Sequence, residues 1–343
     1  MAKECRNSIK WESDEPVKIN TSLEIDYDVM FVTALYERAH FVIDAADNFG
    51  LEFVVPVDAN DNGYFIFLTN VNDKSVDVRI HGSEAKVVGP NKTEVVAKSD
   101  FSQHSSVIHI DAKDEISVYV FRNLSSGKAF GHSVLPVDIL GPSYHLFLDS
   151  TLDTNETAEN VSVCTGYAIE DNTESNVGPV GPVPVSITKE MYDKELGHQK
   201  LLTANRPMAI FCGADDNRAQ MPPRETLGKQ HYIPPLNLDS TEKAEIRLVA
   251  TEDSTIVIIR GNYDHLDTIS LTGITFCRAV ENDMLYDINS TKPIQVHLQM
   301  RSKDLSWASV VVIPPVEQYK SEHVFPGINS IGSRDHFEIV YVY

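Results

Sequence analysis

The sequence lacks long apolar runs. None of its 343 residues belongs to a stretch that approaches the roughly 18 apolar residues needed to span a bilayer as a helix. Residues 1–20 are polar and contain no apolar core of the kind a secretory signal peptide requires. We therefore predict no membrane span, and no signal peptide is visible at the start of this sequence.

Cysteine is scarce. The chain has Cys5, Cys164, Cys212 and Cys277, and no C-x-x-C pair that would favour a zinc site. Four cysteines allow three connectivities, so a disulfide is an open alternative to buried thiols. Cys212 ends an apolar, strand-like run and fits either interpretation.

Positive charge is also in short supply. Lysine and arginine number 29 against 50 aspartates and glutamates, which gives a formal net charge of −21. Such a surface repels phosphate backbones and anionic membranes, so nucleic acid is excluded as an expected partner. High solubility is the simplest consequence of this charge.

Motifs of the common enzyme classes are absent. The sequence has no H-E-x-x-H, no G-x-S-x-G, no phosphate-binding P-loop and no G-x-G-x-x-G, and its 12 histidines do not cluster. We expect no catalytic residue and no cofactor. Because carboxylates are so numerous, a paired-carboxylate, carbohydrate-active hydrolase on a β scaffold stays open as the alternative.

Strand signals dominate what is present. Short runs rich in Val, Ile, Tyr and Phe alternate with polar residues and end at turn-forming residues, which favours strands. The runs lie at 63–71, 75–80, 115–121, 207–212, 245–250, 254–260, 293–298 and 309–314. Residues 28–46 suit either a helix or a strand, and residues 188–200 suit a short helix or a loop. Many short strands separated by frequent turns predict an all-β fold of sandwich-like character.

A degenerate repeat organises these strands. The segments AKDEISVYV (112–120), ANRPMAIFC (204–212) and STKPIQVHL (290–298) each join a polar turn to an alternating strand, at intervals of 92 and 86 residues. An apolar-Pro, Leu-Gly, Tyr element follows at 135–144 and 221–232, and a version without Leu-Gly lies at 313–319. Glycine at such a bend can supply a positive φ.

The repeat predicts three serial antiparallel β-sandwich-like modules after an N-terminal segment. We expect a segment at 1–47 that contributes a strand, then modules at 48–146, 147–237 and 238–343. Residues 336–343 read as a strand that closes the last module.

At this point the residues resemble a known family. GLEFVVPV (50–57), FLTNVNDKSVDVRIHG (67–82), AKDEISVYVFRN (112–123) and SVLPVDILGPSYHLF (133–147) look like the N-terminal domain family of IgGFc-binding protein. The resemblance extends over about residues 50–320. It implies a non-catalytic, extracellular or cell-surface binding or adhesion protein of mucus-like settings. Fc binding itself does not follow from it.

Loops on a rigid β scaffold are where binding residues usually lie. The loops at 122–132, 213–220 and 299–307 are equivalent by the repeat. They contain the candidate binding residues Arg122, Phe130, Arg218, Arg301 and Trp307, of types enriched in binding hot spots. The expected partner is an extracellular protein or a glycan. The alternative is that these loops are ordinary solvated connectors.

A weak calcium motif occurs at 58–63, where DANDNG resembles the front of an EF-hand loop. The closing Glu is missing, because the residue there is Thr69. We therefore favour a turn joining two strands of a hairpin, with Asp58 and Asp61 as weak calcium candidates.

The sequence has six N-x-S/T sequons, which are glycan acceptors only in a secreted chain. The candidates are Asn20, Asn91, Asn123, Asn155, Asn160 and Asn289. They favour a secreted or cell-surface location, and a cytosolic location, in which the sequons mean nothing, is the alternative.

Overall fold

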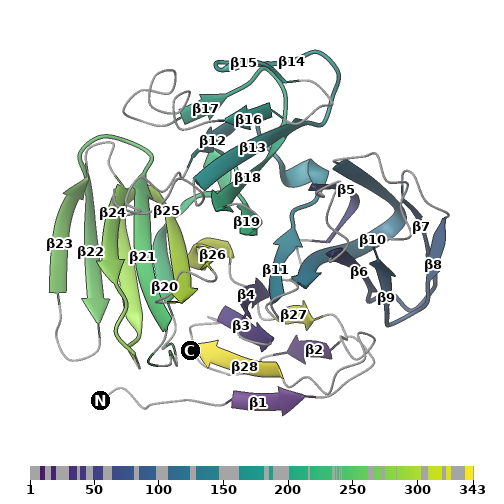
Figure 1. Cartoon of the computed structure of the whole chain (residues 1–343), viewed down its shortest axis with the longest axis horizontal. Coiled ribbons are helices and arrows are strands. Elements are labelled where there is room, and N and C mark those ends of the chain that lie inside the picture. Colours follow the sequence, from purple (N-terminus) through teal and green to yellow (C-terminus); the bar gives the residue numbers. More distant parts are fainter. Residues whose placement is uncertain are drawn as a thin grey trace. The chain divides into compact units, whose positions relative to one another are not determined.

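The structure is a computed structural model, and it consists of antiparallel β-strands joined by turns (Figure 1). It describes residues 8–11, 17–20, 31–36, 39–43, 49–56, 64–80, 85–97, 107–123, 129–146, 162–180, 185–187, 201–214, 217–233, 236, 238, 240, 242–261, 266–271, 275–282, 284–302, 308–318, 322–325 and 337–342. Across these residues no α-helix is present, and hence no helix long and apolar enough to cross a membrane. The predicted all-β class is confirmed.

The chain divides into two compact units. Unit 1 consists of Met1–Ile139 with Tyr319–Tyr343, and unit 2 of Leu140–Gln318. The two ends of the chain therefore belong to the same unit.

Unit 1 contains a seven-stranded sheet built around one long strand. In chain order its strands are β5 (Gly50–Pro56), β6 (Tyr64–Asn70), β7 (Val76–Ile80), β8 (Lys86–Val88), β9 (Lys92–Ala97), β10 (Val107–Asn123) and β11 (Ala129–Val134). The sheet order is β8-β7-β10-β6-β9, and β5 and β11 also pair with β10. The 17 residues of β10 let its first half pair with β5 and β7 and its second half with β6 and β11.

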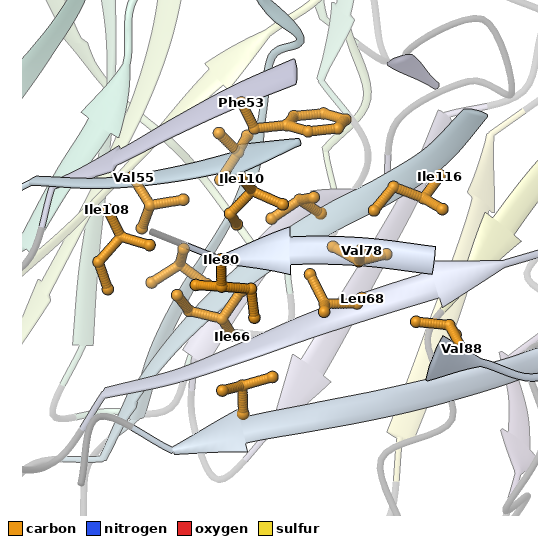
Figure 2. Packing of buried hydrophobic residues seen from close by; sticks show 14 of the residues in the cluster. Phe53, Val55, Ile66, Leu68, Val78, Ile80, Val88, Ile108, Ile110 and Ile116 are labelled. Carbon is orange, nitrogen blue, oxygen red and sulfur yellow. The ribbon is translucent and has the colours of Figure 1, made fainter. Parts of the chain in front are cut away.

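The core of this sheet follows the period-two pattern of its strands. In β7 the side chains of Val76, Val78 and Ile80 are buried, whereas Asp77 and Arg79 between them are exposed. Figure 2 shows Val78 and Ile80 packed with residues of β5, β6 and β10 such as Phe53. Full burial of one such aliphatic side chain contributes about 1.5–3 kcal/mol, so this cluster is a main source of the sheet's stability.

Unit 2 contains a second seven-stranded sheet with the same topology. Its strands are β20 (Gly228–Ile233), β21 (Glu242–Ala250), β22 (Thr255–Gly261), β23 (Leu266–Leu271), β24 (Thr275–Ala279), β25 (Tyr286–Ser302) and β26 (Ala308–Ile313). The order is β23-β22-β25-β21-β24, and β20 and β26 also pair with the long strand β25. Strands β20 to β26 thus correspond in order to β5 to β11, and each has the same neighbours as its counterpart.

Smaller sheets complete unit 2. Their strands are β12 (Ser143–His145), β13 (Ser162–Ala168), β14 (Thr173–Ser175), β15 (Gly178–Val180), β16 (Val185–Ile187), β17 (Leu201–Thr203), β18 (Met208–Ala214) and β19 (Asn217–Gln220). The largest of these sheets has the order β16-β13-β18-β19, β12 pairs with β17, and β14 pairs with β15. In unit 2 the short 3-10 turns η4 (Arg224–Thr226) and η6 (Val316–Gln318) follow β19 and β26, and in unit 1 the 3-10 turn η3 (Val137–Ile139) follows β11.

The remaining strands come from both ends of the chain. They are β1 (Ser8–Trp11), β2 (Val17–Asn20), β3 (Phe31–Tyr36), β4 (Ala39–Ile43), β27 (Glu322–Phe325) and β28 (Phe337–Val342). One sheet has the order β1-β28-β3-β4, and β2 pairs with β27. The ambiguous stretch at 28–46 therefore provides strands where it is described. The last strand does not close the preceding module as expected: β28 pairs with β1 and β3, at the other end of the sequence.

Candidate functional site

The three predicted binding loops each close a β-hairpin at the same place in the strand order. They join β10 to β11, β18 to β19, and β25 to β26. We call these hairpins 1, 2 and 3. Their tips, residues 124–128, 215–216 and 303–307, lie outside the described residues. Each hairpin rises from a central strand that has a run of buried residues, so its base is held by packing on both faces of the sheet.

Hairpin 1 brings two of the predicted residues together. Arg122 of β10 lies directly opposite Phe130 of β11, and on the other side it lies opposite Tyr64 of β6. Residues directly opposite each other in adjacent strands share a face of the sheet. Tyr64 packs against the apolar core cluster of the sheet, so these three positions form a row at one end of that core.

Hairpin 2 holds its arginine on the sheet. Arg218 lies opposite Gly213 and is half-buried, and its Nη1 donates a hydrogen bond to Oγ1 of Thr165 at 2.6 Å. Thr165 is buried in β13. One donor group of Arg218 is therefore already engaged inside the sheet.

Hairpin 3 starts at Arg301. This residue lies opposite Ala308 of β26 and opposite Lys243 of β21. Trp307 precedes β26 directly in the sequence and lies outside the described residues. As in hairpin 1, an arginine lies next to the last residue of the central strand, and an aromatic residue lies near the start of the next strand in the sequence.

The predicted calcium residues Asp58 and Asp61 lie outside the described residues. β5 and β6, which flank them, pair with different halves of β10 and not with each other, so the connection is not the hairpin turn expected. Across the described residues no group of three or more His, Cys, Asp or Glu side chains could hold a metal ion. The hydrolase alternative likewise gains no support from the contacts of this part of the chain.

Two sequon asparagines have described side chains. Asn91 is exposed in the turn between β8 and β9 with φ of 50°. Asn289 lies within β25, half-buried, and its Nδ2 donates to Oδ1 of Asp287 at 2.6 Å. Asn20 and Asn123 end β2 and β10, and Asn155 and Asn160 lie outside the described residues. Asn91 is thus the more accessible acceptor of the two.

A disulfide joins Cys164 of β13 to Cys212 of β18, which face each other in the strand register. The sequence left this pairing open. Both sulfurs belong to the buried core of the small sheet. Cys277 is exposed on β24, and Cys5 lies outside the described residues.

One buried polar face escaped the sequence interpretation. Gln295, His297 and Gln299 alternate along β25 and are all buried, as is Arg247 opposite His297. Nη2 of Arg247 lies 3.1 Å from Oε2 of Glu245. Burial, reinforced by the charge of Arg247, lowers the pKa of His297 to about 3. Because these four side chains are buried, they support the sheet and are not available to contact a partner.

Comparison with known proteins adds a family. Residues 197–342 match the model of the family described as "IgGFc binding protein", which confirms the resemblance for this part of the chain. The match contains the second and third repeated strands, at 204–212 and 290–298. No curated protein matches the chain. A solved structure titled "anti-sigma factor domain-containing protein" aligns over 84% of this chain and 98% of its own, at 10% identity and a TM-score of 0.17, and carries no argument.

Proposed function

We propose that this chain, whose residues 197–342 match the IgGFc binding protein family, is a non-catalytic binding or adhesion protein of extracellular fluid or the cell surface. Its partner is a protein, or a glycan carried by one. Recognition takes place through hairpins 1 and 3. The observation that carries the proposal is that each hairpin has an arginine near the end of its central strand and an aromatic residue at or just before the start of the next strand in the sequence.

The scaffold for these hairpins is a row of three serial modules of sandwich-like character. The identical strand order of the two seven-stranded sheets supports this organisation. In the small sheet of unit 2, β13, β16, β18 and β19 pair with one another as β6, β9, β10 and β11 do. We place the start of each module at the glycine that begins or shortly precedes its first strand, Gly50, Gly141 and Gly228, because β20 pairs within the sheet of β25. This moves the expected boundaries at 147 and 238 toward the N-terminus.

The disulfide supports both the repeat and the location. In the repeat alignment Cys164 and Cys212 take the place of Ile66 opposite Val120. All four side chains are buried. A cross-link within the core persists in oxidising compartments and is rare in the cytosol, which favours secretion. The exposed sequon at Asn91 fits the same location.

The choice of hairpins 1 and 3 follows from side-chain chemistry. Arginine and aromatic residues dominate binding hot spots because they bury large areas and donate several hydrogen bonds. Hairpin 2 has Asp215 and Asp216 at its tip, and its Arg218 is bonded to Thr165. On a chain with a net charge of −21, the arginines of these hairpins would orient an acidic patch of the partner toward them.

The test is a pull-down from native extracellular fluid with the full chain as bait, followed by affinity measurement with the captured partner. The variants are Arg122→Ala/Phe130→Ala and Arg301→Ala/Trp307→Ala. Each should weaken binding by about 10- to 100-fold if these residues are hot spots.

The matched control is Arg206→Ala. Arg206 forms an ion pair with Glu170. It lies two residues before β18 begins at Met208, at the end of that strand opposite to hairpin 2. An exposed pair of this kind contributes little, so the affinity should not change. Enzymatic removal of glycans from the partner separates protein recognition from glycan recognition. If neither hairpin variant changed the affinity for the captured partner, the proposal would be wrong.

A further inference from the structure

We infer that the two ends of the chain together build a fourth copy of the repeat, which the N-terminal strands close by pairing with the C-terminal strands. This inference rests on the module order proposed above and not on the binding function. Its evidence is the pattern of strand pairing.

The large sheet of unit 1 defines seven strand positions, occupied in order by β5 to β11. Position 2 pairs with positions 5 and 6, and position 6 pairs with position 7. The first half of position 6 pairs with position 1. Any further copy must reproduce these pairings.

The terminal strands reproduce each of them. β28 in position 2 pairs with β1 in position 5 and with β3 in position 6, and β3 pairs with β4 in position 7. β27 in position 1 pairs with β2, which stands for the first half of position 6. All four pairings are antiparallel, as in the other sheets. Positions 3 and 4, filled by β7 and β8 in the first copy, fall between β28 and β1, where no strand is described.

Sequence order supports the same assignment. The glycine that opens a copy follows a carboxylate by three residues. Gly141 follows Asp138 and Gly228 follows Glu225 in this way, and so does Gly50 after Asp47. In the first two cases the stretch is the 3-10 turn that ends the preceding copy. Residues 44–49, which follow β4, thus share this carboxylate spacing with the turns that follow position 7 in the first two copies.

Packing between strands agrees as well. In unit 2, β19 in position 7 of one copy contacts β26 in position 7 of the next. In unit 1, β4 contacts β11. The fourth copy therefore meets the first copy through the same pair of positions.

The inference has a direct chemical test. In the fourth copy Ile339 of β28, in position 2, lies opposite Ala34 of β3, in position 6. In the second copy the same two positions are paired through Cys164 and Cys212. We design Ala34→Cys/Ile339→Cys in a background of Cys5→Ser and Cys277→Ser. Cysteines directly opposite in an antiparallel pair meet the distance that a disulfide needs.

Under mild oxidation the designed pair should cross-link in most molecules, as read by peptide mass spectrometry without reduction. The matched control, Ala34→Cys/Val342→Cys, is displaced by three residues along β28 and should cross-link far less. Circular dichroism of each variant beside the parent reports whether the chain is folded. Equal cross-linking of the two pairs, or none in the designed pair of a folded chain, overturns the inference.

A circular permutant gives a second test that does not depend on cysteine. Ser8 lies opposite Val340, so a short Gly-Ser linker can join residue 343 to residue 1, and new ends are opened between residues 47 and 48. The permutant then has four uninterrupted copies in sequence. It should retain cooperative unfolding and a melting temperature within a few degrees of the parent, whereas an unfolded or aggregated product overturns the inference.

Discussion

At the scale of single residues, Gly141, which precedes β12, and Gly228, which begins β20, are needed because other groups approach them closely and not for an unusual backbone. Neither Gly141 nor Gly228 has a φ in the left-handed region, contrary to the expectation that they supply a positive φ. A Cβ at Gly141 would lie 2.8 Å from Cβ of Pro223 and 2.9 Å from Oε2 of Glu225. A Cβ at Gly228 would meet Pro315 and Glu317 in the same way. Each glycine thus lets the chain pack closely against a later 3-10 turn, Gly141 against η4 and Gly228 against η6.

The substitution Gly141→Ala should therefore destabilise the fold by about 1–3 kcal/mol, as overpacking does in a filled site. The control is Gly89→Ala, whose Cβ would meet only Lys92, with Cγ at 3.3 Å on a flexible side chain. This control should be neutral or slightly stabilising, because alanine restricts the unfolded chain. Urea unfolding of both variants and the parent measures the difference. Equal stability of the two variants would contradict the close approach.

At the scale of the strand, one buried cross-strand position tolerates a disulfide or two aliphatic side chains. Cys164 and Cys212 hold it in the small sheet, and Ile246 and Leu298 hold it in the large sheet of unit 2. All four side chains are buried. The position needs a filled core, and the cross-link adds a constraint on the unfolded chain.

We expect Cys164→Ile/Cys212→Leu, which copies the pair in the large sheet, to fold and to lose about 2–4 kcal/mol, the usual contribution of a disulfide. The cysteines are separated by 48 residues, a loop long enough for that contribution. Cys164→Ser/Cys212→Ser should lose more, because it also leaves polar hydroxyls and reduced volume in the core. Chemical denaturation of the three proteins gives the ranking. A serine variant as stable as the aliphatic one would be inconsistent with this packing.

Strands were predictable from the sequence, but their partners were not. Runs such as 75–80 and 254–260 alternate with period two and became β7 and β22. The alternation of Gln295, His297 and Gln299 ordinarily marks a solvent-facing side, yet this face is buried. Val310 of β26 lies on the same side and belongs to the core cluster of the small sheet. Burial by a neighbouring sheet is a long-range property that no local pattern encodes.

The candidate site was predictable only in part. The repeat predicts that 122–132, 213–220 and 299–307 have equivalent positions, and each of these stretches joins a repeated strand to its antiparallel neighbour. It could not show that Arg218 bonds Thr165, since these residues are 53 apart in the sequence. The pairing of residues 337–342 with the N-terminal strands was missed for the same reason.

At the scale of the whole molecule, acid should weaken unit 2 through its buried histidines. Burial lowers the pKa of His231 and that of His297 to about 3, from an ordinary value of 6.5. Between these two values the unfolded chain binds protons that the folded chain excludes, so stability is lost as the pH falls from about 6.5 toward 3. At pH 4.5 the loss is about 2–3 kcal/mol for each histidine.

The variant His231→Gln/His297→Gln should remove most of this difference. Its denaturation midpoint should fall less than that of the parent between pH 7 and pH 4.5, even if its stability at pH 7 is lower. Both proteins have the same carboxylates, so their acid titration cancels in the comparison. Parallel losses in the two proteins would show that the histidines do not cause the acid sensitivity.

The burial of Val310 among the core residues of the small sheet has a consequence for protein engineering. Either sheet of unit 2, excised without the other, would lose the neighbour that covers this apolar contact. Grafted into another protein, it would expose that apolar face and tend to aggregate. Unit 2 as a whole, Leu140–Gln318, which contains both sheets, is therefore the piece to transplant.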